Sequence, residues 1–529
     1  MKFVKYLVLS IVLILLHISC DAVKSPNKVV LTGTARDNST LCPVPGAVIR
    51  LSKLGTETKT DMNGKFNISL SVSHLQSGAI DTLTIENDKY WKKQTEVKLY
   101  EKTEKVILLN AQKHRLIVTT DIGGTDPDDE QSMVHLMVSA NDIDIEGIIC
   151  GLAWLEGKLG TGVVNSIIDA YDADYPNLII HDKSYPTPAY LRSITKPGQH
   201  TSKMAGVGEG KDSPGSELII SAVDNDDPRP VWLNAWGGAN TIAQALWKVK
   251  STRSQEDVNK FLNKIRIYDI LGQDDAGAWI VKTFPDLIYI RNVEIYGWGP
   301  SDEWVKENVQ SKGALGTKYP DRIWATEGDS PAFMHLIAKG LNDPDKIDSG
   351  GWGGRFELTK VANIRGMDIA QRSGVDESFY DPYFMFTNTS EGNESINQWK
   401  KHIWNNLAVK MTWAVTNTYD DANHHPVAII DKDSTMQIIY LSAESDSKVS
   451  LDAGMSYDPD GDNLTYNWYF YQEPSSYKGL VSIANNKSSH LDLLIPLDAS
   501  GKNIHIILEL TDSGFPNLTT YRRVVIDVN

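Results

Sequence analysis

The sequence predicts an α/β protein: a parallel sheet with helices on both faces, flanked by a β-sandwich on each side. Between residues 114 and 422, strand-like apolar runs alternate with helix-like runs, which is typical of a parallel sheet covered by helices. Before and after this region, short runs of alternating apolar and polar residues are separated by Gly, Asn and Asp, which indicates β-sandwiches. The 529 residues are enough for about three or four domains.

The composition is that of a folded protein with an acidic balance. Hydrophobic residues make up 41% of the chain and charged residues 23%, so we expect no long disordered stretch. The 52 Lys and Arg against 68 Asp and Glu give a formal charge of −16. Because this charge repels phosphate groups, we expect no nucleic-acid partner.

Residues 1–20 are predicted to be a bacterial lipoprotein signal. Two lysines precede the apolar run "LVLSIVLILLHI", which is too short for a comfortable membrane span and ends at Ser19-Cys20. A small residue before cysteine resembles a lipobox, although His17 and Ile18 depart from its usual pattern. We therefore expect Cys20 to carry a lipid that anchors the protein in the cell envelope, in the outer membrane or facing the periplasm. The alternative is plain secretion.

Residues 28–110 are predicted to form the first β-sandwich. "TDMNGKFNISL" places a tight turn at Asn63-Gly64 between two strands. "PGAVIRL" followed by "TKTDMNGKFNI" resembles the carboxypeptidase-regulatory-like sandwiches of bacterial surface proteins. The segment contains no group of residues typical of catalysis, so we interpret it as a spacer.

The α/β region, residues 114–422, begins with a strand in "HRLIVTTD", a helix in "DPDDEQSMVHLMVSAN" and a second strand in "IDIEGIICG". Such a unit predicts parallel pairing. We expect further strands at "LIIHD", "PVWLNAWGG", "KIRIYDILG" and "LIYIRNV", and helices at "VVNSIIDAYDA", "NTIAQALWKV", "AGAWIVKTF" and "SPAFMHLIAKGL". From about residue 355 to 422 we expect a helical or irregular extension.

Residues 426–529 return to β patterning and resemble an immunoglobulin-like sandwich of the PKD or cadherin type. Its "DPDGD" stretch, residues 458–462, is interpreted as a turn rather than a metal site. Besides Cys20 the chain has only Cys42 and Cys150, which we expect to be small buried hydrophobic residues.

Four aspartates follow the first strand of the α/β region within nine positions: Asp121, Asp126, Asp128 and Asp129. Carboxylates this close raise one another's pKa, and a buried unpaired charge is costly, so the cluster is either solvated or neutralised by a cation. Helix capping alone would explain two of the four.

Three other stretches also join a strand-like run to a helix-like run: "NAWGGANT", "GQDDAG" and "TEGDSPAF". In open parallel sheets, ligands bind beyond the carboxyl ends of the strands, so these stretches are expected to converge on the aspartates. Oxygen ligands of this kind suit hard cations, and Ca²⁺ best, because it tolerates irregular geometry. The sequence therefore predicts a calcium site.

Six blocks carry a resemblance to a known family: "TTDIGGTDPDDEQSMVHL", "KDSPGSELII", "PVWLNAWGGANTIAQAL", "GQDDAGAWI", "EGDSPAF" and "GLNDPDKIDSGGWGGRFE". They are similar to the bacterial family described as cellulose-binding with a nucleoside-hydrolase-like domain, and the resemblance covers residues 114–529. It implies a nucleoside-hydrolase fold, whose first strand ends in a calcium-binding D-x-D-x-x-x-D-D motif.

The resemblance also implies roles for individual residues. Asp121 would bind calcium and activate the attacking water, with Asp129, Asp329 and the backbone carbonyl of Asn240 as further ligands. Asp128, Gln273 and Asp274 would contact the sugar. Glu327 or Asp274 would supply the acid for a sugar leaving group.

Two departures from the hydrolase pattern matter. The spacing here is D-x-x-x-x-D-x-D-D, so the first aspartate of the motif falls on Thr119, and a second register would align Asp126 instead of Asp121 with the catalytic aspartate. We favour Asp121 because it ends the strand. The hydrolases commonly carry a histidine before the third carboxylate to protonate a nucleobase, but this chain has Gly328 there, so we do not expect a nucleoside substrate.

Several other residues have two interpretations. Five tryptophans either stack on sugar rings or pack in the core: Trp232, Trp236, Trp298, Trp324 and Trp352. His335 is expected to be a packed histidine. Asp212 and Ser213 either close over the site or cap a helix.

The sequence supports two functional hypotheses. The first is a calcium-dependent hydrolase of glycosyl bonds in a glycan fragment. The second is a polysaccharide-binding protein on the same fold, with cellulose as an example. A purely structural surface protein would leave the acidic strand ends unexplained. The sequence does not predict the oligomeric state.

Overall fold

The computed structural model describes residues 27–38, 43–72, 78–87, 89–109, 111–152, 157–337, 339–361 and 377–529. Cys20 and Cys42 lie outside these residues, so the lipid anchor and the burial of Cys42 stay predictions; Cys150 is buried. None of the helices in the described part of the chain combines the length and apolarity needed to cross a membrane. The chain divides into two compact units, Met1–Gln112 and Lys113–Asn529.

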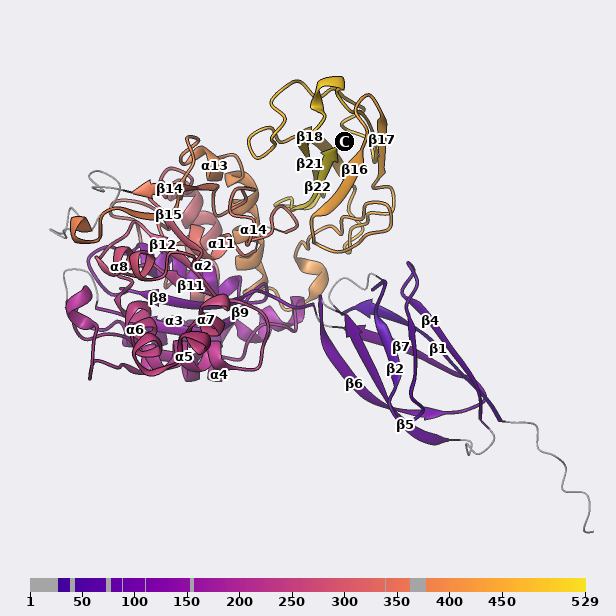
Figure 1. Ribbon diagram of the computed structural model, residues 1–529, viewed down its shortest axis with the longest axis horizontal. Helices are drawn as coiled ribbons and strands as arrows, with labels where there is room; N and C mark the ends of the chain where they lie inside the picture. Colours follow the sequence, from indigo (N-terminus) through magenta and orange to yellow (C-terminus); the bar gives the residue numbers. More distant parts are fainter. Residues whose placement is uncertain are drawn as a thin grey trace, which may run out of the picture. The chain divides into compact units, whose positions relative to one another are not determined.

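The first unit contains two β-sheets (Figure 1). Its strands are β1 (Asn27–Asp37), β2 (Val48–Leu51), β3 (Thr56–Lys59), β4 (Lys65–Val72), β5 (Ala79–Asn87), β6 (Tyr90–Leu99) and β7 (Thr103–Leu109). The sheets have the orders β4-β1-β7 and β3-β2-β5-β6, and alternate residues such as Leu31, Ile49 and Leu83 form one buried core. The predicted turn lies between β3 and β4, where Asp61 Oδ1 accepts the N–H groups of Asn63 and Lys65.

The second unit is built on an eight-stranded sheet of order β10-β9-β8-β11-β12-β13-β15-β14. Its strands are β8 (Arg115–Thr120), β9 (Asp144–Cys150), β10 (Thr195–Pro197), β11 (Val231–Ala235), β12 (Ile265–Ile270), β13 (Tyr289–Asn292), β14 (Phe356–Val361) and β15 (Tyr383–Asn388). Every neighbouring pair is parallel except β14 and β15, which are antiparallel. The predicted α/β sheet is thus confirmed.

Helices cover both faces of this sheet because its strand residues alternate between two apolar faces. Leu116 and Val118 of β8 face one helical layer, whereas Ile117 faces the other. The first layer contains α2 (Asp128–Val138), α3 (Thr161–His181), α4 (Pro188–Ile194), α11 (Ser330–Met334) and α14 (Lys400–Trp413). The second contains α5 (Pro214–Asp224), α6 (Asn240–Thr252), α7 (Gln255–Asn263) and α8 (Ala276–Thr283).

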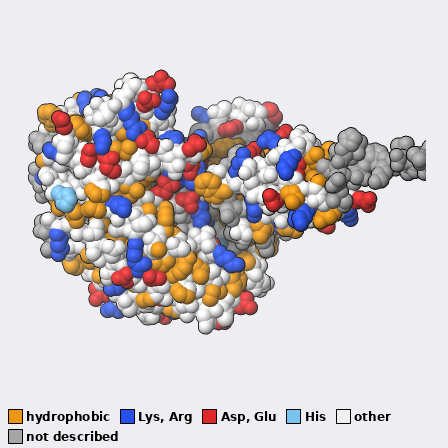
Figure 2. Space-filling view, turned by 90° about the horizontal axis from the view of Figure 1, so that it is seen from below, with side chains coloured by type: hydrophobic (Ala, Val, Ile, Leu, Met, Phe, Trp, Pro, Cys, Tyr) orange, Lys and Arg blue, Asp and Glu red, His pale blue; other side chains and the backbone are white. Residues whose placement is uncertain are grey.

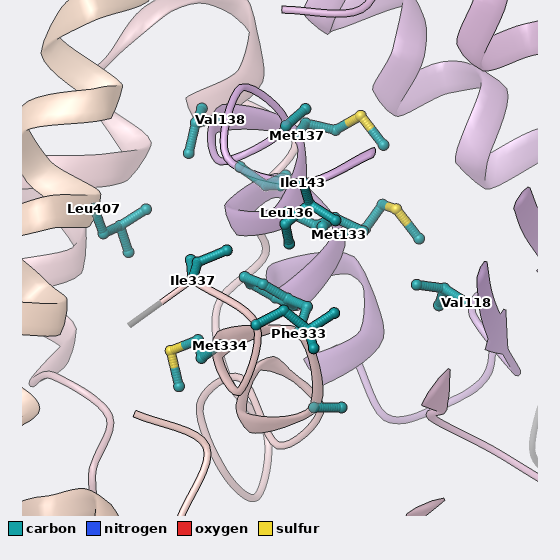
Figure 3. Packing of buried hydrophobic residues seen from close by; sticks show 14 of the residues in the cluster. Val118, Met133, Leu136, Met137, Val138, Ile143, Phe333, Met334, Ile337 and Leu407 are labelled. Carbon is teal, nitrogen blue, oxygen red and sulfur yellow. The ribbon is translucent and has the colours of Figure 1, made fainter. Parts of the chain in front are cut away.

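The packing of α2 against α11 matters most for the site. Figure 3 shows Phe333 of α11 lying beside Leu136 and Met133 of α2, and all three side chains are fully buried. Asp128 and Asp129 open α2, and Asp329 directly precedes α11. Hydrophobic packing between two short helices therefore holds these three carboxylates near one another.

Three expectations about local structure were wrong. "LIIHD" is not a strand, because α3 runs through it to His181, with Tyr171, Asp174, Leu178 and His181 buried at helical spacing. "SPAFMHLIAKGL" gives only the short α11, and Lys339 and Gly340 then take positive φ values of 48° and 90°, which end any helix. The extension after residue 355 contributes β14 and β15 to the sheet as well as α13 (Glu394–Asn397) and α14.

The strand order reverses next to β8. From β8 the chain moves outward to β9 and β10, then returns to place β11 on the opposite side of β8. The carboxyl ends of β8 and β11 therefore border the topological switch point, where open α/β sheets bind their ligands. Asp121 directly follows β8, so the acidic stretch lies at this position.

The C-terminal part of the second unit is a sandwich of two sheets, β16-β22-β21-β18 and β17-β20-β19. Its strands are β16 (Ile439–Ala443), β17 (Lys448–Asp452), β18 (Thr465–Phe470), β19 (Ile483–Ala484), β20 (His490–Leu494), β21 (Asn503–Thr511) and β22 (Thr519–Val528). The buried Arg523 of β22 donates hydrogen bonds to the carbonyls of Leu341, Ser349 and Gly350, at 2.6 to 2.9 Å. Asp458 accepts the N–H groups of Asp460 and Asp462, as a turn residue does.

Charged side chains are mixed on the face that Figure 2 shows. Lys and Arg side chains are spread among Asp and Glu side chains rather than gathered over one element. A surface that binds nucleic acid collects its basic residues in one region. The described residues on this face do not have that pattern.

Candidate active site

A cavity of about 830 Å³ opens at the carboxyl ends of β8 and β12. Its wall includes Asp329 and the four aspartates that follow β8, which are Asp121, Asp126, Asp128 and Asp129. Gln273, which follows β12, and Trp324, which precedes α11, also line it. The structure thus brings together the residues after β8 and β12 and Asp329, as the sequence predicted. Two details were wrong: among the described residues none of "NAWGGANT" lines the cavity, and the segment before Asp329 is a loop rather than a strand.

Three carboxylates lie closest to one another. Oxygen atoms of Asp128, Asp129 and Asp329 are all within 4.8 Å, and the three residues are 8%, 5% and 2% exposed. Oδ2 of Asp329 is buried and has no hydrogen-bond partner among the described residues. Because buried carboxylates without partners are costly, this oxygen-rich arrangement fits a divalent cation such as Ca²⁺.

The pKa values of these groups reflect burial and mutual repulsion. Burial, followed by the negative charge of the neighbouring aspartates, raises the pKa of Asp128, Asp129 and Asp329 well above the ordinary value. Burial and the nearby Asp128 raise the pKa of Asp121 to about 7. The Thr120 hydroxyl donates a hydrogen bond to Asp129 and partly stabilises its charge.

Asp121 lies where two strand ends approach closely. A Cβ atom on Gly237, which follows β11, would be only 2.5 Å from Asp121 Oδ1, so glycine is needed at this position. The charge of Asp121 acts more strongly than that of Asp126 on the pKa of Asp129 and of Asp329. Both Asp121 and Asp126 line the cavity, and the charge of Asp126 helps to raise the pKa of Asp128, so both aspartates adjoin the three carboxylates.

Asn240 and Asp274 point elsewhere. Asp274 is buried, and its two oxygens accept the N–H groups of Asn240, at 3.2 Å, and of Ala276, at 3.0 Å, which fixes the starts of α6 and α8. The Asn240 amide donates to the carbonyl of Thr201. Within the described part of the chain neither residue lines the cavity. The sugar contact predicted for Asp274 therefore has no counterpart in this cavity, whereas Gln273 does line it. The metal contact predicted for the backbone carbonyl of Asn240 stays a prediction.

Glu327 also faces away from the cavity. It has a positive φ of 51° and is fully buried, and its carboxylate accepts hydrogen bonds from Tyr319 at 2.7 Å and Ser330 at 2.8 Å. His135 Nδ1 lies 2.6 Å from Oε2, and the Glu327 N–H donates to Gln131. These contacts fix the turn that presents Asp329, so Glu327 is a positioning residue here rather than the acid that the sequence suggested.

Replacing Glu327 with glutamine is expected to lower the free energy of unfolding by about 1–3 kcal/mol, because an amide cannot accept from all three donors and leaves one unsatisfied. Calcium affinity should fall with it, since Asp329 is held by the same turn. Denaturant unfolding and calorimetric calcium titration measure the two effects. The exposed Glu307, changed to glutamine, is the control. Unchanged stability would contradict this role.

Gly328 explains why the site lacks the histidine of the hydrolases. A Cβ atom at this position would lie 2.4 Å from Asp128 Oδ2 and 3.2 Å from Ile295 Cδ1. No side chain therefore fits while Asp128 keeps its place beside Asp129 and Asp329.

Most of the other candidate site residues contribute to the packing or hydrogen bonding of the fold. Four of the five tryptophans are buried in the core: Trp232, Trp236, Trp298 and Trp352. Trp324 is 58% exposed and lines the cavity. His335 is buried, with Nε2 3.0 Å from the carbonyl of Pro344. Ser213 caps α5, and Asp212 forms an ion pair with Lys248 of α6 at 2.8 Å, so both have structural contacts.

The sheet order, the switch-point cavity and the clustered carboxylates define an α/β protein of the nucleoside-hydrolase-like class. Residues 115–356 match the family described as "Cellulose-binding Sde182, nucleoside hydrolase-like domain", and residues 448–528 match "Cellulose-binding protein Sde0182, C-terminal domain". The chain belongs to this cellulose-binding, nucleoside-hydrolase-like family.

A solved structure supports the assignment. It is described as a nucleoside hydrolase-related hypothetical protein from Saccharophagus degradans that is associated with carbohydrate metabolism. The two chains are 51% identical, with a TM-score of 0.75, over 79% of this chain and 100% of the other. A search of curated proteins gives no match.

Two further solved structures are less similar. A PKD domain from the KIAA 1837 protein is 22% identical over 17% of this chain and 79% of the other, with a TM-score of 0.14. The effector protein XOO4466 is 8% identical over 57% of this chain and 94% of the other, with a TM-score of 0.33. At these TM-scores neither likeness carries an argument about function.

Proposed function

We propose that the cavity is a calcium-dependent site that hydrolyses a glycosyl bond in a glycan fragment or related glycoside. The observation that carries this proposal is the convergence of three buried carboxylates, with Asp329 Oδ2 lacking a hydrogen-bond partner among the described residues. The carbohydrate class follows from the family description and from the cavity, which excludes a histidine for a nucleobase at Gly328.

Different residues of the cavity would bind the cation, accept a proton and contact the sugar. Asp128, Asp129 and Asp329 would hold the cation. Asp128 would then be a metal ligand in addition to contacting the sugar, as expected from the sequence. A bound Ca²⁺ supplies positive charge that orients sugar hydroxyls and lowers the pKa of a bound water. Asp121, which lines the cavity beside the carboxylates, would accept the proton of the attacking water. The departing sugar oxygen would take its proton from solvent water, since the described wall has neither glutamate nor histidine. Gln273 lies in the wall within reach of the sugar.

A second candidate function is glycan binding without cleavage. The cavity wall, over the residues that the structure describes, includes neither glutamate nor histidine to protonate a leaving group. The family description also names cellulose binding. Under this alternative the same carboxylates hold calcium and a sugar end, and Asp121 has no catalytic role.

Calcium calorimetry followed by a glycan-library screen, with and without EDTA, tests the proposal. Calcium binding together with EDTA-sensitive release of sugar would support the hydrolase. Calcium-dependent glycan binding with no released product would favour the binding protein. Absence of calcium binding would contradict both assignments of the carboxylates.

The metal-free protein is expected to lose stability as pH rises from about 4 to about 7. The pKa of Asp121 in the fold, about 7, is above its unfolded value, so its favourable contribution is complete below the unfolded pKa and is lost as pH rises through the folded one. Asp128, Asp129 and Asp329 shift in the same direction. Calcium should restore the loss, with a larger shift in Tm at about pH 8 than at about pH 5. Thermal unfolding with calcium or EDTA at both pH values measures this, and equal shifts would contradict it.

A further inference from the structure

Asp329, one of the three clustered carboxylates, precedes a helix that is too short to hold its own position. The helix α11 contains only 5 residues, Ser330–Met334. Helices of this length are not stable in water by themselves, so tertiary contacts must fix α11 and with it Asp329. The helix packs against α2, and a second set of contacts comes from the chain that follows α11.

The chain after α11 turns back over the end of this helix, and residues 339–355 are called the return segment here. Asn342 Nδ2 donates a hydrogen bond to the carbonyl of His335 at 3.2 Å. A Cβ atom on Gly353 would lie 2.5 Å from His335 Cβ and 2.7 Å from the carbonyl oxygen of Pro331, so the return segment lies directly against α11. The position of the return segment therefore affects the position of α11.

The C-terminal sandwich holds the return segment through Arg523 of β22. The Arg523 guanidinium is fully buried and donates hydrogen bonds of 2.6 to 2.9 Å to the carbonyls of Leu341, Ser349 and Gly350. These three residues belong to the return segment and are themselves buried. A buried carbonyl needs a donor, and one planar guanidinium supplies all three in fixed directions.

Tyr521, two positions earlier in β22, contacts the return segment as well. Its N–H donates to the carbonyl of Lys339 at 2.9 Å, and its hydroxyl accepts a hydrogen bond from Trp352 Nε1 at 3.3 Å. A Cβ atom on Gly340 would lie only 2.3 Å from the Tyr521 carbonyl oxygen. Because side chains two apart in a strand face the same side, Tyr521 and Arg523 present one face of β22 to the return segment.

We propose that the C-terminal sandwich positions Asp329 of the calcium site, with Arg523 and Tyr521 as positioning residues that act through the return segment and α11. This inference rests on the proposed function, because it takes Asp329 to be a calcium ligand. It makes the sandwich part of the scaffold of the metal site rather than a separate module on the same chain.

Arg523→Lys tests the proposal, with Arg522→Lys as the matched control. Arg522 is the neighbouring residue of β22 and is equally buried, but it donates to carbonyls of the C-terminal region itself, those of Ala428, Asp433 and Gln437. A lysine ammonium keeps the charge but cannot serve three carbonyls in fixed directions, so both variants should have a lower Tm. Only Arg523→Lys should also lower calcium affinity, by about tenfold, as changes behind metal ligands do.

Calcium affinity is measured by calorimetry on the full chain, at a temperature below the Tm of every variant, so that unfolding does not imitate a loss of affinity. Tyr521→Phe is a milder second variant, since it removes only the hydroxyl that contacts Trp352 and His402. It should lower calcium affinity in the same direction as Arg523→Lys, but by less.

The results that would overturn the inference differ from the result that would overturn the proposed function. Wild-type calcium affinity in both Arg523→Lys and Tyr521→Phe would show that the sandwich does not position Asp329. An equal loss of affinity in Arg523→Lys and Arg522→Lys would also overturn the inference, because it would show a general loosening of the sandwich. Absence of calcium binding by the wild type would overturn the proposed function itself.

Discussion

Replacing Asp329 with asparagine is expected to lower calcium affinity by at least about 100-fold while making the metal-free protein more stable. The loss of affinity follows from the removal of one of three converging carboxylates, since even changes to residues behind metal ligands cost about 10- to 100-fold. The metal-free protein should become more stable because the substitution removes a buried carboxyl group from among four other aspartates. The repulsion from these aspartates raises the pKa of Asp329. Calcium calorimetry and denaturant unfolding with EDTA measure the two effects.

Two controls separate this result from a general change of charge. Asp286→Asn changes an exposed aspartate and should alter neither quantity. Asp129→Asn should repeat the loss of calcium affinity, although it also disturbs the hydrogen bond from Thr120. If Asp329→Asn binds calcium as tightly as the wild type, the three carboxylates are not the metal centre. If the metal-free variant is less stable, Asp329 has a structural partner that outweighs the repulsion.

The sequence predicted the parts of the fold that depend on periodicity. The strand–helix–strand unit from β8 to β9 and the alternation that follows produced the parallel sheet. The prediction from sequence failed where a chain segment is apolar but has neither helical nor strand periodicity. "LIIHD" reads as a strand by composition, but it is the last turn of α3, because Leu178 and His181 continue a buried helical stripe that begins upstream.

Convergence of the strand ends was predictable, but the direction of each side chain was not. Asp121 and Gln273 follow β8 and β12, and the switch-point rule places both at one cavity. Asp329 reaches the same cavity from a loop after α10 (Gly313–Gly316) rather than from a strand end. Glu327 is only two residues from Asp329, yet its positive φ of 51° turns its carboxylate toward Tyr319 and away from the cavity. No spacing pattern in the sequence reveals this, because a positive φ at a residue other than glycine is uncommon.

The same reasoning applies to Asp274. The family resemblance implied sugar contacts for Gln273 and Asp274, and Gln273 does line the cavity. Asp274 instead accepts N–H groups at the starts of two helices. An aspartate before a helix has this local alternative to ligand binding, and only tertiary structure decides between the two. Asp128 and Asp129 differ from Asp274 because they lie beside another carboxylate, that of Asp329, and the Thr120 hydroxyl donates to Asp129.

Replacing Asp121 with asparagine is expected to reduce turnover by about 10²- to 10⁴-fold and to change calcium affinity much less than Asp329→Asn does. Asparagine keeps the size of the side chain at the close contact with Gly237, so the fold should be retained, but it cannot accept a proton from water. The measurement is sugar release from the best substrate of the library screen, together with calorimetric binding of the same glycan.

Asp126→Asn is the matched variant, because Asp126 also lines the cavity and occupies the other register of the motif. If Asp126→Asn abolishes turnover and Asp121→Asn does not, the catalytic base is Asp126 and the first register is wrong. A different result separates the two functions: if the wild type binds glycan with calcium but releases no sugar, and both variants weaken that binding, the two carboxylates act only in recognition. The pH profile distinguishes a missing base from a misplaced sugar, because loss of the base should remove the rise of activity with pH, whereas a misplaced sugar lowers activity at every pH.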